Sequence, residues 1–206
     1  MIILASQSAS RKAMLEAAGV AFTAEAAGVA FTAEAAGVDE ESVKGALIAE
    51  GTDGRRLADA LAEMKAVKVS RRHPTALVLG CDSTVAAEDG TLIDKAGTRE
   101  ESRTQLQGLR GTTHKLTSAA VVALGGEPIW RHGDTAKLTM RPFSDAFLDS
   151  YLDAEWPAIG GCVGGYRLEG LGAQLFSRID GDHFTILGLP LLPLLDWLRV
   201  RGELVA

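Results

Sequence analysis

The hydrophobic pattern at the start of the chain predicts a short strand followed by a helix. Met1–Ala5 is apolar and runs into small hydroxyl residues. Beyond them, Met14 and Leu15 lie at helical spacing, and Gly19 follows where a helix commonly ends. The expected order is therefore strand, serine-rich turn, helix.

The next part of the chain predicts two helices, a buried strand and a hairpin. Residues 42–72 have helical periodicity, interrupted by Gly51-Thr52-Asp53-Gly54 and ended by Pro74. Thr75–Leu79 is a continuous apolar run, typical of a strand buried on both faces. Glu88-Asp89-Gly90 then predicts a hairpin turn.

The second half continues to alternate strands and helices. We expect a helix at Arg99–Gly108, strands at 115–124, 128–131 and 135–143, a helix from the cap Ser144 to Ala154, strands at 166–168 and 174–179, and a final helix at Leu191–Arg199. This alternation predicts an α/β class with a mixed sheet. No segment has the composition of a linker, so residues 1–206 are expected to form one domain.

An exact tandem duplication lies near the N-terminus. Ala17–Glu25 reads AAGVAFTAE and is repeated as Ala26–Glu34. A nine-residue period matches no solenoid class, and two copies cannot build a solenoid. We interpret the duplication as a local insertion at 17–34, forming an extra loop or a slipped strand.

Composition narrows the class of protein. The 206 residues are 47% hydrophobic and 23% charged, which is typical of a globular protein. A net charge of −6 argues against DNA, RNA or an anionic membrane as a partner. Two cysteines cannot form a disulfide framework, and we expect neither a signal peptide nor a membrane span, because the apolar run at the start is short and no apolar run has membrane length. We therefore expect a cytoplasmic protein that acts on a small molecule.

Hydroxyl side chains and one guanidinium gather in the turn after the first strand. Ser6, Ser8 and Ser10 alternate before Arg11 at the expected start of the helix. Free N–H groups, hydroxyls and a guanidinium at that place can bind an anion. A serine that simply caps the helix is the alternative, and this motif alone favours it.

Asp82 lies at the expected end of the apolar strand, just after Gly80. There a carboxylate can bind a metal ion or accept a proton from water, although an aspartate that begins a turn is an equally good interpretation. Cys81 should point to the opposite face, into the core. Lys95 follows the expected hairpin and should therefore return close to Asp82.

Five charged side chains are candidates for ligand binding, and for most of them there is a simpler alternative. Arg11, Lys65 and Lys95 could bind an anionic ligand, but each alone is typical of a solvated surface. Glu169 lies among the glycines of Gly164–Gly172, where backbone can approach a ligand closely. Glu40 belongs to an acidic run that is either a metal ligand or a solvated face.

Taken together, these motifs resemble the Maf-type nucleoside triphosphate pyrophosphatases (septum formation protein Maf-like). The resemblance runs nearly end to end and rests on ordered blocks: Leu4–Arg11 with Met14-Leu15, Val38-Asp39-Glu40, Lys65-Ala66, Gly80–Ser83, Asp89-Gly90 to Lys95, Gly165-Tyr166 to Glu169-Gly170, Ile179–Asp182 and Gly188–Leu191. It implies a curved mixed sheet with flanking helices and two lobes around a cleft, the Maf/ITPase-like fold.

The resemblance also implies an activity, a cofactor and a site. The reaction is hydrolysis of a nucleoside triphosphate to monophosphate and pyrophosphate, as housecleaning of modified nucleotides, with a divalent cation (Mg²⁺ or Mn²⁺). The implied site residues are Asp82 for catalysis, Asp82 and Glu40 for the metal, and Ser6, Arg11, Lys65, Lys95 and Glu169 for the substrate. A homodimer is possible, since many relatives are dimers. The alternative function is a non-catalytic nucleotide- or partner-binding regulator of cell division.

Departures from the family pattern bear on the substrate. Ala9-Ser10-Arg11 stands where the family often has Pro-Arg-Arg, and Glu169 where members specific for dTTP and UTP usually carry Gln. Both favour a 7-methyl-GTP-like substrate or one with another base over dTTP and UTP. Ser83 stands where the 7-methyl-GTP type is expected to carry Gln, so the base is left open. The duplication adds nine residues before Glu40; we expect one copy to be extruded so that Glu40 still reaches the site.

Overall fold

A mixed β-sheet forms the centre of the molecule in the computed structural model, which describes residues 2–25 and 40–205. Within those ranges seven strands lie in the order β2-β1-β3-β5-β6-β7, with β4 paired to β3. Their bounds are β1 Ile2–Leu4, β2 Phe22–Ala24, β3 Leu77–Ala86, β4 Leu92–Ile93, β5 Thr113–Leu124, β6 Glu127–Met140 and β7 Phe176–Asp180. β1 is parallel to β2 and β3, and the other pairs are antiparallel. The predicted mixed α/β class is confirmed.

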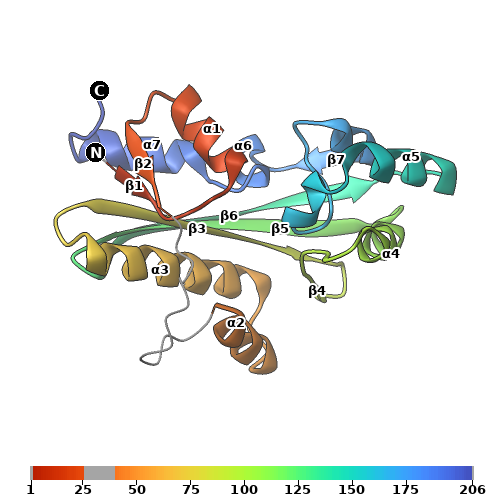
Figure 1. The fold of residues 1–206 in the computed structure, drawn as a ribbon, viewed down its shortest axis with the longest axis horizontal. Coiled ribbons are helices and arrows are strands. Elements are labelled where there is room, and N and C mark those ends of the chain that lie inside the picture. The colour runs from red at the N-terminus through yellow and green to blue at the C-terminus, as the bar shows by residue number, and fades with distance from the viewer. Residues whose placement is uncertain (1, 26–39, 206) are drawn as a thin grey trace.

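Helices cover both faces of the sheet (Figure 1). α3 lies along the lower face in this view, whereas α1, α6 and α7 lie above the sheet. The helix bounds are α1 Ala9–Ala17, α2 Glu40–Ala49, α3 Gly54–Arg72, α4 Arg99–Leu109, α5 Asp145–Glu155, α6 His183–Ile186 and α7 Leu191–Val200, with 3₁₀ turns η1 Ala158–Gly161 and η2 Leu171–Leu175. Ser144 caps α5 as predicted, since its hydroxyl accepts the N–H of Phe147.

Successive side chains of β5 point alternately to the α3 layer and to the layer of helices on the other face of the sheet. Ala119, Val121 and Ala123 pack against the alanines of α3, while Ala120 and Val122 pack with side chains of β1, α1 and α7. Side chains of successive strand residues point to opposite faces, which produces this division. Because the contact with α3 is made by small residues, that helix lies close to the sheet.

Two apolar clusters share the face opposite α3. One contains Leu116 together with residues of α4 and α5, and the other contains Ala120 together with residues of β1, α1 and α7. Leu116, Ser118 and Ala120 point to this same face because they alternate along β5. Ser118 therefore marks a polar seam between two lobes.

Two predicted strand boundaries are wrong. β3 continues past residue 79 to Ala86, because its antiparallel ladder with β5 extends to the pair Ala86–Lys115. The strands expected at 128–131 and 135–143 form the single strand β6, because β5 pairs along nearly its whole length and Gly133 continues the ladder opposite Ala119. In both cases the neighbouring strand sets the length.

The strand predicted at Tyr166–Leu168 is also wrong. Glu155 on α5 accepts hydrogen bonds from Nε and Nη2 of Arg167, at 3.0 and 2.6 Å, and from the N–H of Leu171 at 3.3 Å. These bonds fold the segment back onto α5 in turns instead of a ladder. The first copy of the duplication forms the end of α1 and β2, whereas Ala26–Glu34 lies outside the described residues.

Candidate functional site

The serine-rich turn between β1 and α1 forms one wall of the site. Ser8 is the N-cap of α1, and its hydroxyl accepts the N–H of Arg11 at 3.4 Å. The capping interpretation is therefore confirmed for Ser8. Ser6 has another position: its hydroxyl accepts the N–H of Ser8 and the Nη1 of Arg11, both at 3.2 Å.

The guanidinium of Arg11 is fixed at all three nitrogens. Nε donates to the carbonyl of Gly188 at 2.8 Å, Nη1 to Ser6, and Nη2 to the hydroxyl of Ser83 at 3.1 Å. These three partners are uncharged. Within the described part of the chain no carboxylate forms an ion pair with Arg11, so its positive charge is left for an anionic ligand.

Asp82 and Lys65 form an ion pair across the interface between β3 and α3. Nζ of Lys65 lies 2.5 Å from Oδ1 of Asp82, and the two side chains are only 14% and 15% exposed. The close packing of α3 makes this contact possible, since a Cβ added to Gly80 would lie 2.2 Å from the carbonyl oxygen of Ala62. Asp82 and Gly80 share this face because they are two residues apart.

Asp82 does not lie at the end of its strand as predicted. It lies within β3, just past the point where the shorter neighbour β1 stops pairing, at Leu79. Asp82 thus lies beside the end of β1 rather than at the end of β3. The expected orientation of Cys81 is confirmed: it is buried in the apolar cluster on the other face, and burial raises the pKa of its thiol to about 11.

The glycine-rich loop and the hairpin complete the site. Ser10 on α1 donates a hydrogen bond to Oε1 of Glu169 at 2.7 Å, which connects α1 to a loop 159 residues away. Lys95 is exposed just after β4 and faces the same space. The contacts of Glu155 with Arg167 and Leu171 hold the loop against α5.

A cavity of about 960 Å³ joins these side chains. Of the predicted site residues it is lined by Ser6, Arg11, Lys65, Asp82, Lys95 and Glu169. Ser83 and Leu116 also line it, which places the cavity at the polar seam between the two lobes. Arg167 adds a cation that the sequence did not single out. The described lining thus holds four basic and two acidic side chains, although the whole chain has a net charge of −6.

A divalent metal ion is the group that the motifs imply, and one described carboxylate suits it. Asp82 supplies hard oxygen ligands in the cavity, and Lys65 contacts that carboxylate at Oδ1, at 2.5 Å. Glu40 begins α2, but its side chain lies outside the described part. Among the described residues no three metal-ligating side chains gather. Mg²⁺ is commonly held by one or two carboxylates plus substrate phosphates, so Asp82 fits such an ion.

Comparison with known proteins decides the family. A family model described as Maf-like protein matches residues 1–201. The chain belongs to the Maf family. It is 54% identical over 203 residues to a nucleoside triphosphate pyrophosphatase of Caulobacter vibrioides, covering 98% of this chain and 96% of that protein. It is 51% identical over 203 residues to a protein of the same name from Paramagnetospirillum magneticum, covering 98% and 100%.

A solved structure shares the extent of this Maf chain but not its sequence. The dITP/XTP pyrophosphatase of Mycobacterium abscessus aligns over 98% of this chain and 94% of its own, with 14% identity and a TM-score of 0.43. The family resemblance drawn from the motifs is confirmed by the family model and by the relatives.

Several residues that shape the Maf site escaped the sequence analysis. Gly188 lies in the block Gly188–Leu191, but its carbonyl contact with Arg11 could not be predicted from that block. Glu155 was not singled out, because it acts through long-range contacts with Arg167 and Leu171. Ser118 had a visible signal: it is a hydroxyl residue on a strand face otherwise occupied by Leu116, Ala120 and Val122.

Proposed function

We propose that this protein hydrolyses nucleoside triphosphates to the monophosphate and pyrophosphate. The observation that carries the proposal is the Lys65–Asp82 pair, which lies in one cavity with Arg11, a cation without a described acidic partner. Relatives of 54% and 51% identity are named nucleoside triphosphate pyrophosphatases, which supports this assignment.

The basic side chains suit a polyphosphate. A triphosphate carries several negative charges that must be offset before a nucleophile can approach, and Arg11, Lys65 and Lys95 supply positive charge in the cavity. The hydroxyl of Ser6 accepts two N–H groups, so its own proton is free to donate to a phosphate oxygen. The cavity thus offers both charge and directed donors.

Asp82 is the proposed general base. It accepts a proton from a water molecule that attacks the α-phosphorus, and the bond to the bridging oxygen breaks with its electron pair leaving on pyrophosphate. Lys65 orients the carboxylate through Oδ1, which leaves Oδ2 outside that bond. When bound, a divalent cation held by Asp82, with Glu40 as the expected second ligand, would offset phosphate charge.

Glu169 underlies the proposed preference for a 7-methyl-GTP-like base over dTTP and UTP. An ionised carboxylate only accepts hydrogen bonds. A guanine presents two adjacent donors, N1–H and the N2 amino group, which suit a carboxylate. Thymine and uracil present one N–H between two carbonyl groups, which match a carboxylate less well.

The test is pyrophosphate release from a panel of triphosphates with Mg²⁺ or Mn²⁺, for the wild-type protein and Asp82→Asn. We expect Asp82→Asn to lower kcat by at least about 100-fold while the fold is retained, since general-base groups contribute roughly that much or more. Asp180→Asn, an exposed aspartate on β7, is the matched control and should keep full activity.

Near-normal turnover in a folded Asp82→Asn protein would refute the assignment. Binding of nucleotide by the wild type without any turnover would instead favour the non-catalytic regulator. The homodimer, the cytoplasmic location, the absence of nucleic-acid partners and a single domain over residues 1–206 stay predictions. Among the described residues, no helix is both long and apolar enough to cross a membrane.

A further inference from the structure

A line of hydroxyl groups runs from Arg11 into the interior of the protein. Nη2 of Arg11 donates to the hydroxyl of Ser83 at 3.1 Å, and the hydroxyls of Ser83 and Ser118 are 2.8 Å apart. Ser118 donates to the main-chain carbonyl of Thr185 at 2.7 Å. The line thus connects α1, β3, β5 and α6 across the seam between the two lobes.

Proton counting gives this line one direction. A carbonyl oxygen can only accept a hydrogen bond, so the single hydroxyl proton of Ser118 is donated to the carbonyl of Thr185. Ser83 must therefore be the donor in its contact with Ser118, and it has no second proton to give. The lone pairs of Ser83 are left to accept from Arg11. Every step therefore runs from the guanidinium inward.

The inner end of the line is fixed. Ser118 is fully buried, so its hydroxyl would be costly to bury without these partners. The N–H of Thr185 donates to Oδ2 of Asp182 at 2.7 Å, and its hydroxyl donates to Oδ2 of Asp134 at 3.1 Å. The carbonyl that accepts from Ser118 therefore belongs to a residue held at two other atoms.

We propose that Ser118 is a positioning residue for Arg11, acting through Ser83. It holds the Ser83 proton inward, so that Ser83 presents an acceptor to the guanidinium and cannot donate to the substrate. This inference rests on the proposed function in one respect, namely that the ligand of Arg11 is a polyphosphate. Ser118 itself is buried and does not line the cavity.

The experiment measures kcat and KM for a triphosphate, and the calorimetric Kd for inorganic tripolyphosphate, in Ser118→Ala, Ser83→Ala and the double variant. We expect each single variant to raise KM and Kd on the order of 3- to 10-fold with little change in kcat, the cost of one misdirected charged hydrogen bond. The KM and Kd of the double variant should equal those of each single variant, because both substitutions break the same line of hydrogen bonds.

The background variant Arg11→Ala tests whether Ser118 acts through the guanidinium. Adding Ser118→Ala to Arg11→Ala should cause no further loss of tripolyphosphate affinity. Ser70→Ala is the matched control: Ser70 is equally buried, accepts the N–H of Gly126 at 3.0 Å and does not line the cavity. It should lower stability without changing KM.

An unchanged KM and Kd in Ser118→Ala, or full additivity with Arg11→Ala, would overturn the inference. If Ser118→Ala does not fold, the half-buried Ser83 carries the test, with Ser83→Thr restoring the affinity that Ser83→Ala loses. A wild type that binds tripolyphosphate but hydrolyses no triphosphate refutes the proposed function alone, because the coupling is still read from Kd. Absence of tripolyphosphate binding would overturn both.

Discussion

Gly188 places no side chain in the site, yet its backbone sets the position of Arg11. Its φ is +102°, a region that side-chain-bearing residues rarely adopt, and its carbonyl accepts Nε of Arg11 at 2.8 Å. A Cβ there would lie 3.3 Å from that nitrogen and 3.5 Å from the hydroxyl of Ser83. Gly188→Ala should raise KM several-fold and lower the free energy of unfolding by about 1–3 kcal/mol. Steady-state kinetics and denaturant unfolding check both effects.

Gly202 provides the control for the backbone strain in this prediction. Its φ is +76°, and no atom lies within 4 Å of an added Cβ. Gly202→Ala should therefore lose stability through strain alone and keep the wild-type KM. An equal rise of KM in both variants would show that the effect of Gly188 does not pass through Arg11.

At the scale of residues, chemistry could be predicted from the sequence but contacts could not. Arg11, Lys65 and Asp82 were identified because their charges stand in recognisable motifs, and the structure brings them to one cavity. Two of the three acceptors that orient Arg11 lie 177 and 72 residues away, at Gly188 and Ser83, and only Ser6 is close in sequence. Such distances in sequence are bridged only by the folded sheet, so no local pattern records them.

Among the elements, the contact of α3 with β3 is the one that creates the Lys65–Asp82 pair. A Cβ on Gly80 would lie 2.2 Å from the carbonyl oxygen of Ala62 and 2.6 Å from the main-chain nitrogen of Ala66. Gly80→Ala must push the helix outward, so we expect a loss of about 1–3 kcal/mol or more in unfolding free energy and a large fall in activity. Denaturant unfolding and pyrophosphate release measure the two.

A second substitution shows whether backbone or side chain causes the clash at Gly80. Ala66→Gly removes the Cβ that would lie 2.9 Å away but leaves both main-chain atoms in place. Gly80→Ala combined with Ala66→Gly should therefore remain as impaired as Gly80→Ala alone. Recovery of activity in the double variant would contradict backbone contact as the cause.

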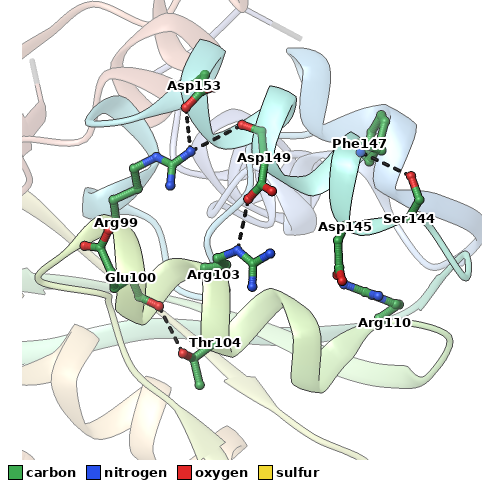
Figure 2. Close-up of polar contacts among 10 residues, drawn as sticks. All are labelled: Arg99, Glu100, Arg103, Thr104, Arg110, Ser144, Asp145, Phe147, Asp149 and Asp153. Atoms are coloured by element: carbon green, nitrogen blue, oxygen red, sulfur yellow. Dashed lines mark hydrogen bonds and ion pairs between the residues drawn. The ribbon is translucent and has the colours of Figure 1, made fainter.

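Three ion pairs join α4 and the residue that follows it, Arg110, to α5, with the arginines on the α4 side and the aspartates on α5 (Figure 2). Arg99 pairs with Asp153 at 2.5 Å, Arg103 with Asp149 at 3.0 Å and Arg110 with Asp145 at 2.5 Å. The hydrogen bond from Arg110 lowers the pKa of Asp145 below its usual range, and the hydrogen bond from Arg103 does the same for Asp149. Their stabilising contribution is therefore present above the unfolded pKa near 4 and is lost as pH falls through the folded pKa.

The stabilising contribution of these ion pairs should also be measurable at neutral pH, from the dependence of the unfolding free energy on salt. These pairs are largely in contact with water, so 1 M NaCl, with a screening length of about 3 Å, should weaken them. The variant Asp145→Asn/Asp149→Asn/Asp153→Asn should lose stability at low salt and show a smaller salt dependence than the wild type. Urea unfolding of both proteins at low and high salt measures this; parallel salt curves would contradict the prediction.

Element types were predictable where the local pattern and the tertiary contacts agree. The helix at Arg99–Leu109 follows its own periodicity and the capping box of Thr98 with Glu101. β3 and β6 instead take their lengths from β5, which pairs with both. The conformation of the segment from Arg167 to Leu171 depends on Glu155, whose buried carboxylate accepts hydrogen bonds from the Arg167 side chain and from the N–H of Leu171. The ends of such strands are set by pairing with the neighbouring strand and cannot be predicted from the sequence of the strand alone.

For the whole molecule, charge is distributed unevenly, and the net charge alone does not show this. The net charge of −6 argues against a polyanion large enough to cover the surface. The cavity nevertheless gathers Arg11, Lys65, Lys95 and Arg167 around two acidic side chains. A small polyanion such as a triphosphate needs only this local surplus. The net charge of the chain thus constrains the size of an anionic partner, but it does not exclude a small one.

The stability of the whole fold also depends on one buried imidazole. His114 on β5 is fully buried in contact with the rings of Tyr166 and Phe176, and Nε2 lies 2.8 Å from the hydroxyl of Tyr166. Burial lowers the pKa of His114 to about 4. An unfolded chain would hold this proton at a pKa of about 6.5. Between these values the unfolded state binds more protons than the folded state, so acid favours unfolding.

The free energy of unfolding should therefore fall as pH drops from about 6.5 towards 4, by up to about 1.4 kcal/mol per pH unit from His114 alone. His114→Gln cannot take up this proton, so its unfolding free energy should vary less across the same window, whatever its value at pH 7. Urea unfolding at pH 7, 6 and 5 measures both slopes. His183→Gln, an exposed histidine on α6, should keep the wild-type profile. Equal slopes in wild type and His114→Gln would show that this imidazole does not couple folding to pH.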